Sequence, residues 1–100
     1  MADFILFMHN DAPGAASTPG PADWPAYFAK LRKAGAFQGG SSIGDGLCVS
    51  HAPSPPPITR HLSGYIRIQA DSLSDARALV TGNPVFEAGG TVEIRELPKD

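Results

Sequence analysis

Cysteine is almost absent from this sequence, which contains only Cys48 among 100 residues. A single cysteine excludes a disulfide within the chain, and proteins of reducing compartments commonly lack disulfides. The sequence also lacks a basic N-terminal region followed by an apolar run. No apolar stretch approaches about 20 residues, the length that spans a bilayer as a helix. We therefore expect a cytoplasmic protein that does not enter a membrane.

Positive charge is scarce and scattered. The chain has 8 Lys and Arg residues against 10 Asp and Glu, for a net charge of −2. The tightest basic group is Lys30, Arg32 and Lys33, at the end of a predicted helix, where cations favour the negative end of the helix dipole. Nucleic-acid phosphates require concentrated positive charge, so we expect no nucleic-acid partner.

Motifs that bind cofactors or metals are also missing. The glycines of residues 39–46 match neither the phosphate-binding GxxxxGK[ST] pattern nor GxGxxG, and no CxxC, HxH or HxxxH spacing occurs. His9, His51 and His61, with Asp11 or Asp45, have suitable atoms for a metal but lack such spacing. We therefore expect no cofactor and no metal.

The composition is that of a globular chain, with 42% hydrophobic and 18% charged residues. A chain of this length forms one domain, and we assign residues 1–100 to it. On folding it buries somewhat under about 70% of its unfolded surface, which is enough for a modest core.

Asp3–His9 (DFILFMH) is apolar at nearly every position. A strand with one face in water would alternate, so this run predicts a central strand that is covered on both faces. Phe4, Leu6 and Met8 point to one face, and Ile5 and Phe7 point to the other.

The remaining elements follow from periodicity and from helix start and stop signals. A loop over 10–22 precedes a helix over 23–34, with Trp24, Phe28 and Leu31 in its apolar stripe and Tyr27 beside them. A second helix covers 72–81, and its apolar set is Leu73, Ala76, Leu79 and Val80. Further strands are predicted at 36–43, 63–70 and 91–97, with a short returning strand at 47–50, a proline-rich irregular segment at 52–57 and a helical turn at 84–88.

This order, β-α-β-(β)-β-α-β, predicts an α+β fold of the ferredoxin-like, split β-α-β type. Its antiparallel sheet has the order 4-1-3-2, and two helices cover one face. Nothing in the chain remains to cover the other face, where the first strand is still apolar. We therefore expect a homodimer in which two sheets pack face to face.

The C-terminal half resembles the YCII-related family. The resemblance is strongest over residues 64–95, in Gly64-Tyr65-Ile66-Arg67-Ile68 and in the stretch from Asn83 to Arg95. His9-Asn10-Asp11 and the segment from Gly35 to Gly40 also resemble members of that family. The resemblance implies a ferredoxin-like fold that dimerises as an α+β barrel.

For function, the resemblance implies small-molecule chemistry. Some relatives are enzymes, including a dehydrochlorinase of aromatic degradation, and a His-Asp pair has been suggested as the working site in some. Many members carry an Asp-Gly-Pro-Phe motif before the third main strand. This chain has the proline run there instead, and its first helix carries no histidine, so a helix-borne His-Asp pair does not carry over.

The sheet order brings the end of the first strand beside the starts of the third and fourth. His9, Asp11, His61, Tyr65 and Glu93 are therefore expected near one end of the sheet. A histidine beside a carboxylate can transfer protons near neutral pH. One interpretation is that His9 acts as a general base oriented by Asp11, with His61 nearby. The other is that His9 is a structural strand-end residue and that Asp11 begins a turn.

Tyr65, Arg67 and Glu93 belong to a polar stripe on the face away from the helices. They can bind a small-molecule ligand in a pocket of the dimer, with Arg67 holding an anionic group. Alternatively they form cross-strand pairs at the interface. Cys48 lies between Leu47 and Val49, which favours a role as a small hydrophobic side chain over a role as a nucleophile.

Three hypotheses of function follow. The first is a cofactor-free small-molecule enzyme with lyase- or isomerase-like proton transfer in a pocket of the homodimer. The second is a non-catalytic binding or regulatory module that uses the same pocket. The third is a structural subunit whose barrel is filled with side chains.

Overall fold

The computed structural model describes residues 1–12 and 23–99. Most of the loop expected over 10–22 therefore lies outside the described residues. The elements are β1 (Ala2–His9), α1 (Asp23–Lys33), β2 (Phe37–Ser42), β3 (Leu62–Ala70), α2 (Leu73–Ala78), α3 (Pro84–Glu87) and β4 (Thr91–Leu97). The short strand expected at 47–50 is wrong, because these residues join no ladder.

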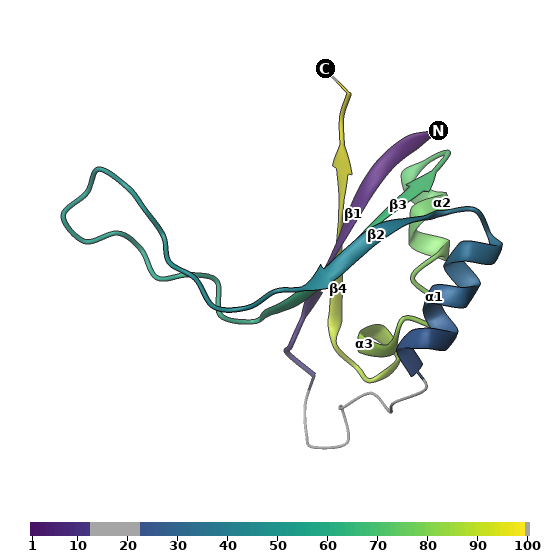
Figure 1. Cartoon of the computed structure of the whole chain (residues 1–100), viewed down its shortest axis with the longest axis horizontal. Coiled ribbons are helices and arrows are strands. Elements are labelled where there is room, and N and C mark those ends of the chain that lie inside the picture. The colour runs from purple at the N-terminus through teal and green to yellow at the C-terminus, as the bar shows by residue number, and fades with distance from the viewer. Residues whose placement is uncertain (13–22, 100) are drawn as a thin grey trace.

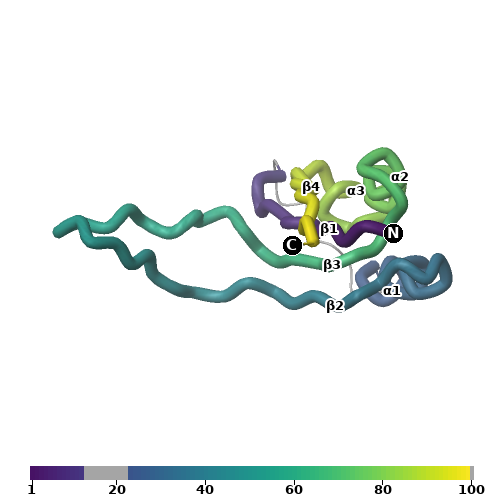
Figure 2. Tube along the Cα trace, turned by 90° about the horizontal axis from the view of Figure 1, so that it is seen from above, coloured from purple at the N-terminus to yellow at the C-terminus, as the bar shows by residue number. Residues whose placement is uncertain are grey.

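The four strands form one antiparallel sheet in the order β2-β3-β1-β4 (Figure 1). This is the predicted order and the ferredoxin-like arrangement. The apolar β1 lies between β3 and β4, as its two-sided hydrophobicity predicted. All three helices lie on one side of the sheet in both views (Figures 1 and 2).

The alternation along β1 separates its two faces. Phe4, Leu6 and Met8 are buried in the core, at 2%, 0% and 3% exposure. Ile5 and Phe7 are only half-buried and point to the opposite face. We call this opposite face the open face, because no helix of the described residues covers it.

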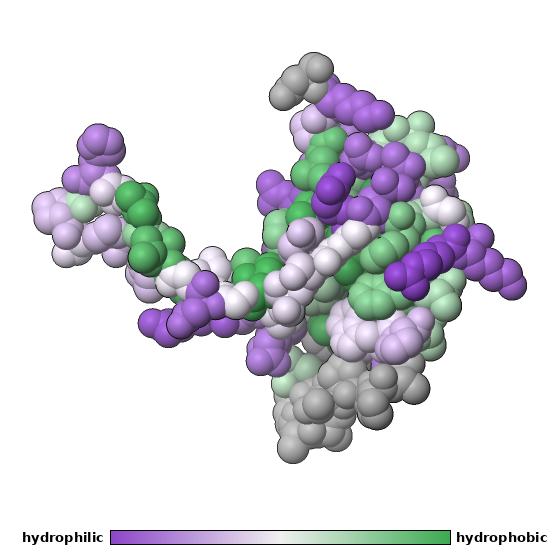
Figure 3. All heavy atoms as spheres, viewed as in Figure 1, coloured by the Kyte–Doolittle hydropathy of each residue, from purple (hydrophilic) through white to green (hydrophobic). Residues whose placement is uncertain are grey.

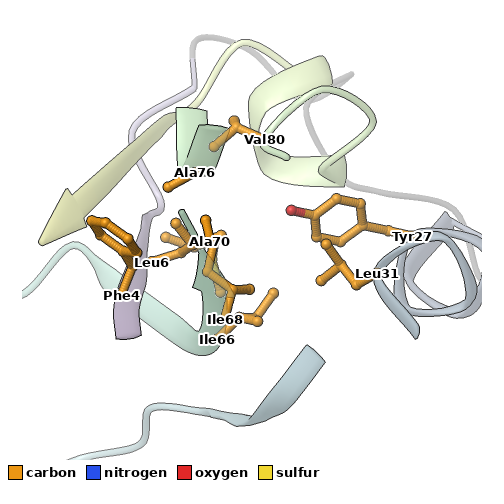
Figure 4. Close-up of a cluster of buried hydrophobic side chains, with 10 residues drawn as sticks. Phe4, Leu6, Tyr27, Leu31, Ile66, Ile68, Ala70, Ala76 and Val80 are labelled. Carbon is orange, nitrogen blue, oxygen red and sulfur yellow. The ribbon is translucent and has the colours of Figure 1, made fainter. Parts of the chain in front are cut away.

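The core lies between β1, β3 and the helices (Figure 4). Leu6, Ile66, Ile68 and Leu31 are fully buried there. The Tyr27 hydroxyl of α1 donates a hydrogen bond of 2.7 Å to the Leu79 carbonyl, which ties α1 to the end of α2. Burial raises the pKa of Tyr27 above its ordinary value, so the neutral phenol is the form that packs here.

The two short helices begin at side-chain caps. The Ser72 hydroxyl accepts a hydrogen bond of 3.1 Å from the Asp75 N–H, and the Asn83 Oδ1 accepts from Val85 and Phe86. The helix expected over 72–81 stops at Ala78. Its first residue, Leu73, belongs to the predicted apolar set but is 59% exposed, whereas Ala76 is fully buried.

Glycines let β2 approach β3 closely. The ladder is irregular between Phe37 and Gly39, where Gly39 has a φ of 120° that side chains rarely adopt. A Cβ atom at Gly40 would lie 2.5 Å from the Tyr65 carbonyl oxygen. Beyond Ser42 the chain leaves the sheet and returns at Leu62; we call residues 43–61 the arm (Figure 1).

Candidate functional site

Two histidines and a glutamate meet where β1 ends. The His9 Nε2 lies 3.0 Å from the Glu93 Oε1, across the β1–β4 pair. The His61 ring stacks on the His9 ring, with 4.7 Å between centroids and 25° between planes. The His9 side chain is only 13% exposed, whereas Glu93 is 42% exposed. His9 is thus held between a carboxylate and an aromatic ring.

Asp11 does not orient His9 as expected. Its Oδ1 accepts a hydrogen bond of 2.8 Å from the Thr91 N–H, and its Oδ2 accepts one of 2.7 Å from the Thr91 hydroxyl. These bonds lower the pKa of Asp11 below its ordinary value, first through the Thr91 hydroxyl, and the nearby His9 adds a minor contribution. Asp11 joins the segment after β1 to the start of β4, and Glu93 is the carboxylate on His9.

The polar stripe of the open face lies next to this pair. In the sheet register, Phe7 of β1 is opposite Tyr65 of β3 and Glu93 of β4. Ile5 of β1 is likewise opposite Arg67 of β3 and Arg95 of β4. The Arg95 Nη1 lies 3.4 Å from the Glu93 Oε2, at the long end of hydrogen bonding. Glu93 therefore lies between a histidine and an arginine.

A cavity of about 570 Å³ opens at the same end of the sheet. Its walls include Met8 and Ile66 of the sheet, Trp24 and Phe28 of α1, and Val85 of α3. The Trp24 and Phe28 rings stack with 5.6 Å between centroids and 29° between planes, and together they form an aromatic wall. Its size and mostly apolar lining, with a few polar groups, are typical of small-molecule sites.

The predicted site residues divide between the cavity and the open face. His9 and Tyr65 line the cavity, together with the polar Ser41 and Ser63. The cavity lining among the described residues does not include Asp11, His61, Arg67 or Glu93. His9 is the residue shared by both arrangements, since it lines the cavity and contacts Glu93.

Sequence reasoning missed the aromatic wall. Trp24 and Phe28 were predicted only as members of the apolar stripe of the helix, because they recur at helical spacing with Leu31. The structure buries Leu31 fully but leaves Trp24 and Phe28 half-buried at the cavity. The available signal was their position in the first half of the helix, directly after the long loop.

Within residues 1–12 and 23–99, no three His, Cys, Asp or Glu side chains are grouped closely enough to hold a metal ion. The same residues include no helix with the length and hydropathy needed to span a bilayer.

Comparison with known proteins gives evidence on the fold only. No protein-family model and no curated protein matches the sequence. Among solved structures, the chain is similar to 5-chloro-2-hydroxyhydroquinone dehydrochlorinase from Burkholderia phenoliruptrix, in complex with 2,5-dihydroxybenzoquinone. The identity is 13% and the TM-score 0.58, over 98% of this chain and 95% of the other. The chain therefore has the ferredoxin-like fold of that small-molecule enzyme.

Proposed function

We propose that this chain is a YCII-related, cofactor-free enzyme that transfers a proton on a small molecule, by lyase- or isomerase-like chemistry, in a cytoplasmic homodimer. One observation carries the proposal: His9 lines an apolar cavity of about 570 Å³ while its ring contacts Glu93. A partly buried histidine with a carboxylate partner at a small-molecule cavity is an arrangement suited to general-base catalysis.

The His9–Glu93 contact assigns roles to the two ring nitrogens. An ionised carboxylate can only accept a hydrogen bond, so the Nε2 carries the hydrogen that it donates to Glu93. The Nδ1 then keeps a lone pair and is the atom that takes a proton from the substrate. Glu93 stabilises the imidazolium that forms. The stacked His61 ring limits rotation of His9.

The cavity walls favour a planar, largely apolar substrate. A flat ring can lie against Trp24 and Phe28, while Ser41, Ser63 and Tyr65 offer polar groups for substituents. The structurally similar dehydrochlorinase is named for a chlorinated hydroxyhydroquinone and was solved with a dihydroxybenzoquinone. Loss of HCl from such a ring to give a hydroxyquinone moves one hydroxyl proton to the chlorine-bearing carbon. A second hydroxyl proton is then removed while chloride leaves with the electron pair of the C–Cl bond. His9 can take the proton from the hydroxyl in either step and return the first one to the ring carbon.

Homodimerisation is supported by the open face. Ile5 and Phe7 lie half-buried at the centre of the sheet, without a covering helix among the described residues. A second sheet packed there would remove these side chains from water. Arg67 and Arg95, opposite Ile5 in register, would then lie inside the interface, where they can hold an anionic group of a ligand or pair across it.

The test compares wild type with His9→Ala, Glu93→Gln and the control His51→Ala, a change on the exposed arm. Chloride release from 5-chloro-2-hydroxyhydroquinone and binding of 2,5-dihydroxybenzoquinone are measured. We expect His9→Ala to lower kcat by at least about 100-fold, Glu93→Gln to lower it less, and His51→Ala to change nothing.

Unchanged turnover in His9→Ala would rule out the proposed role of His9. If wild type and His9→Ala both bind the quinone and neither releases chloride, the cavity is that of a non-catalytic binding module.

A further inference from the structure

The arm is the feature that the proposed chemistry does not use. Residues 43–61 extend far from the sheet as two limbs that run side by side (Figures 1 and 2). None of these residues is buried. Leu47 and Val49 are 77% and 84% exposed, the two most exposed of the chain's large hydrophobic side chains in the described residues. Two such side chains, two residues apart on a projecting segment, are suited to packing against a partner.

The chain exposes more surface than a compact monomer does. Its accessible area is 6744 Å², whereas a folded monomer of its mass is expected to expose about 5,400 Å². Its radius of gyration is 15.0 Å, compared with about 12.7 Å for a compact domain of this length. The excess area is larger than the roughly 800 Å² that each partner buries in a standard interface.

The composition of the arm suits a preformed binding element. Pro53, Pro55, Pro56 and Pro57 lie in its returning limb, and proline restricts the backbone to extended conformations. A stiff segment loses less conformational entropy on binding than a flexible one. The space-filling view shows apolar side chains along the arm, away from the body of the molecule (Figure 3).

The direction of the arm favours a partner that lies on the open face. Both views show the helices at one end of the molecule and the arm at the other, with the sheet between them (Figures 1 and 2). The arm thus projects from the side where Ile5 and Phe7 are uncovered. A copy stacked on the open face would lie alongside the arm, and two-fold symmetry would bring its own arm back to the first copy.

We propose that the arm clasps a second copy of this chain and that Leu47 and Val49 are buried in that contact. The inference rests on the homodimer of the proposed function and adds the element that holds it together. It also links the dimer to the site, because His61 at the base of the arm stacks on His9 and the His61 carbonyl accepts the Asn10 N–H.

The first experiment measures the dimer dissociation constant by sedimentation equilibrium. The double variant Leu47→Ser/Val49→Ser is compared with Leu73→Ser/Phe86→Ser, which removes two exposed apolar side chains from the helices. We expect the arm variant to raise the dissociation constant at least about 100-fold. The helix variant should leave it within about threefold of wild type.

The second experiment follows amide hydrogen exchange over residues 43–52 above and below the dissociation constant. The arm amides should be slowed at least about tenfold in the dimer and should exchange freely in the monomer. If the dimer is unchanged in the arm variant and its arm amides exchange freely, the clasp is refuted while the homodimer stands. If wild type is a monomer at about 100 µM, a concentration at which a specific dimer would form, both the clasp and the proposed homodimer fail.

Discussion

The position of the His9 ring is set by contacts with its neighbours. Its ring is 13% exposed, hydrogen-bonded at one nitrogen to Glu93 and stacked on His61. In the proposed mechanism, these contacts limit its rotation and leave its Nδ1 to take a proton from the substrate. Asp11, two residues along the chain, serves the fold instead, because both of its oxygens accept hydrogen bonds from Thr91.

At this scale we predict how Asp11 responds to pH. Its folded-state pKa lies below the ordinary value because Thr91 hydrogen-bonds to the ionised carboxylate. Its contribution to stability is therefore fully present above the pKa of the unfolded chain. It is lost as pH falls through the lowered folded-state pKa. Carboxyl chemical shifts from NMR should give an Asp11 midpoint below 3.8.

The matched control is Thr91→Val, which removes the hydroxyl donor and keeps the N–H. The Asp11 midpoint should rise in this variant, and its acid unfolding should begin at higher pH than in wild type. An Asp11 midpoint that does not move would show that the Thr91 hydroxyl has no influence on the carboxylate.

Among the elements, α1 contributes to both the core and the cavity. Leu31 and Tyr27 hold it in the core, and Trp24 and Phe28 form the wall of the cavity. The β2–β3 pair also serves the cavity, because Gly40 and Gly64 line it and are positions where the two strands approach closely. Both α1 and the β2–β3 pair therefore contribute to the fold and to the cavity.

We predict that Gly40→Ala destabilises the fold by about 1–3 kcal/mol, because the new methyl group would meet the Tyr65 carbonyl oxygen at 2.5 Å and push β2 from β3. Gly44→Ala is the control. A Cβ atom there meets nothing within 4 Å, so the change should stay within about 0.5 kcal/mol. Urea denaturation of the three proteins gives both differences. Equal stability of Gly40→Ala and wild type would contradict the close approach of the strands.

At the scale of the whole molecule, the sheet has one covered and one open face. The helices and core occupy the covered face, while Ile5 and Phe7 lie on the open one. The arm projects away from the helices (Figure 1). The proposed second copy would account for both features, because it would cover the open face and give Leu47 and Val49 a place to pack.

Phe7→Lys tests the open face directly. A charge placed at its centre should raise the dimer dissociation constant at least about 100-fold, because the ammonium would be buried without a partner. The monomer should stay folded, since Phe7 is only half-buried and lies outside the core cluster. Sedimentation and circular dichroism measure the two effects, with the exposed Leu73→Lys as control. Unaltered dimerisation of Phe7→Lys would exclude this face as the interface.

Local patterns along the chain were sufficient to predict the fold. The unbroken apolar run of β1 indicated a central strand, the alternation over 63–70 and 91–97 indicated strands, and Ser72 indicated a helix start. These signals depend on residues a few positions apart, whose geometry is set by the periods of helix and strand. The ferredoxin-like order of the sheet follows from them and is confirmed.

The site depended on contacts that no local pattern records. The alternation of residues along β1 separates its two faces, but it does not indicate which face the helices cover. In the structure, Leu6 is buried under the helices and Phe7 lies on the open face. The partner of His9 is Glu93, 84 positions away, rather than the neighbouring Asp11. That choice is made by the β1–β4 register, which brings Glu93 diagonally beside His9 on one face. By itself the sequence determined which segments become strands and helices. Only the tertiary structure decided which side chains contact one another, such as His9 and Glu93, because register and packing are properties of the assembled sheet.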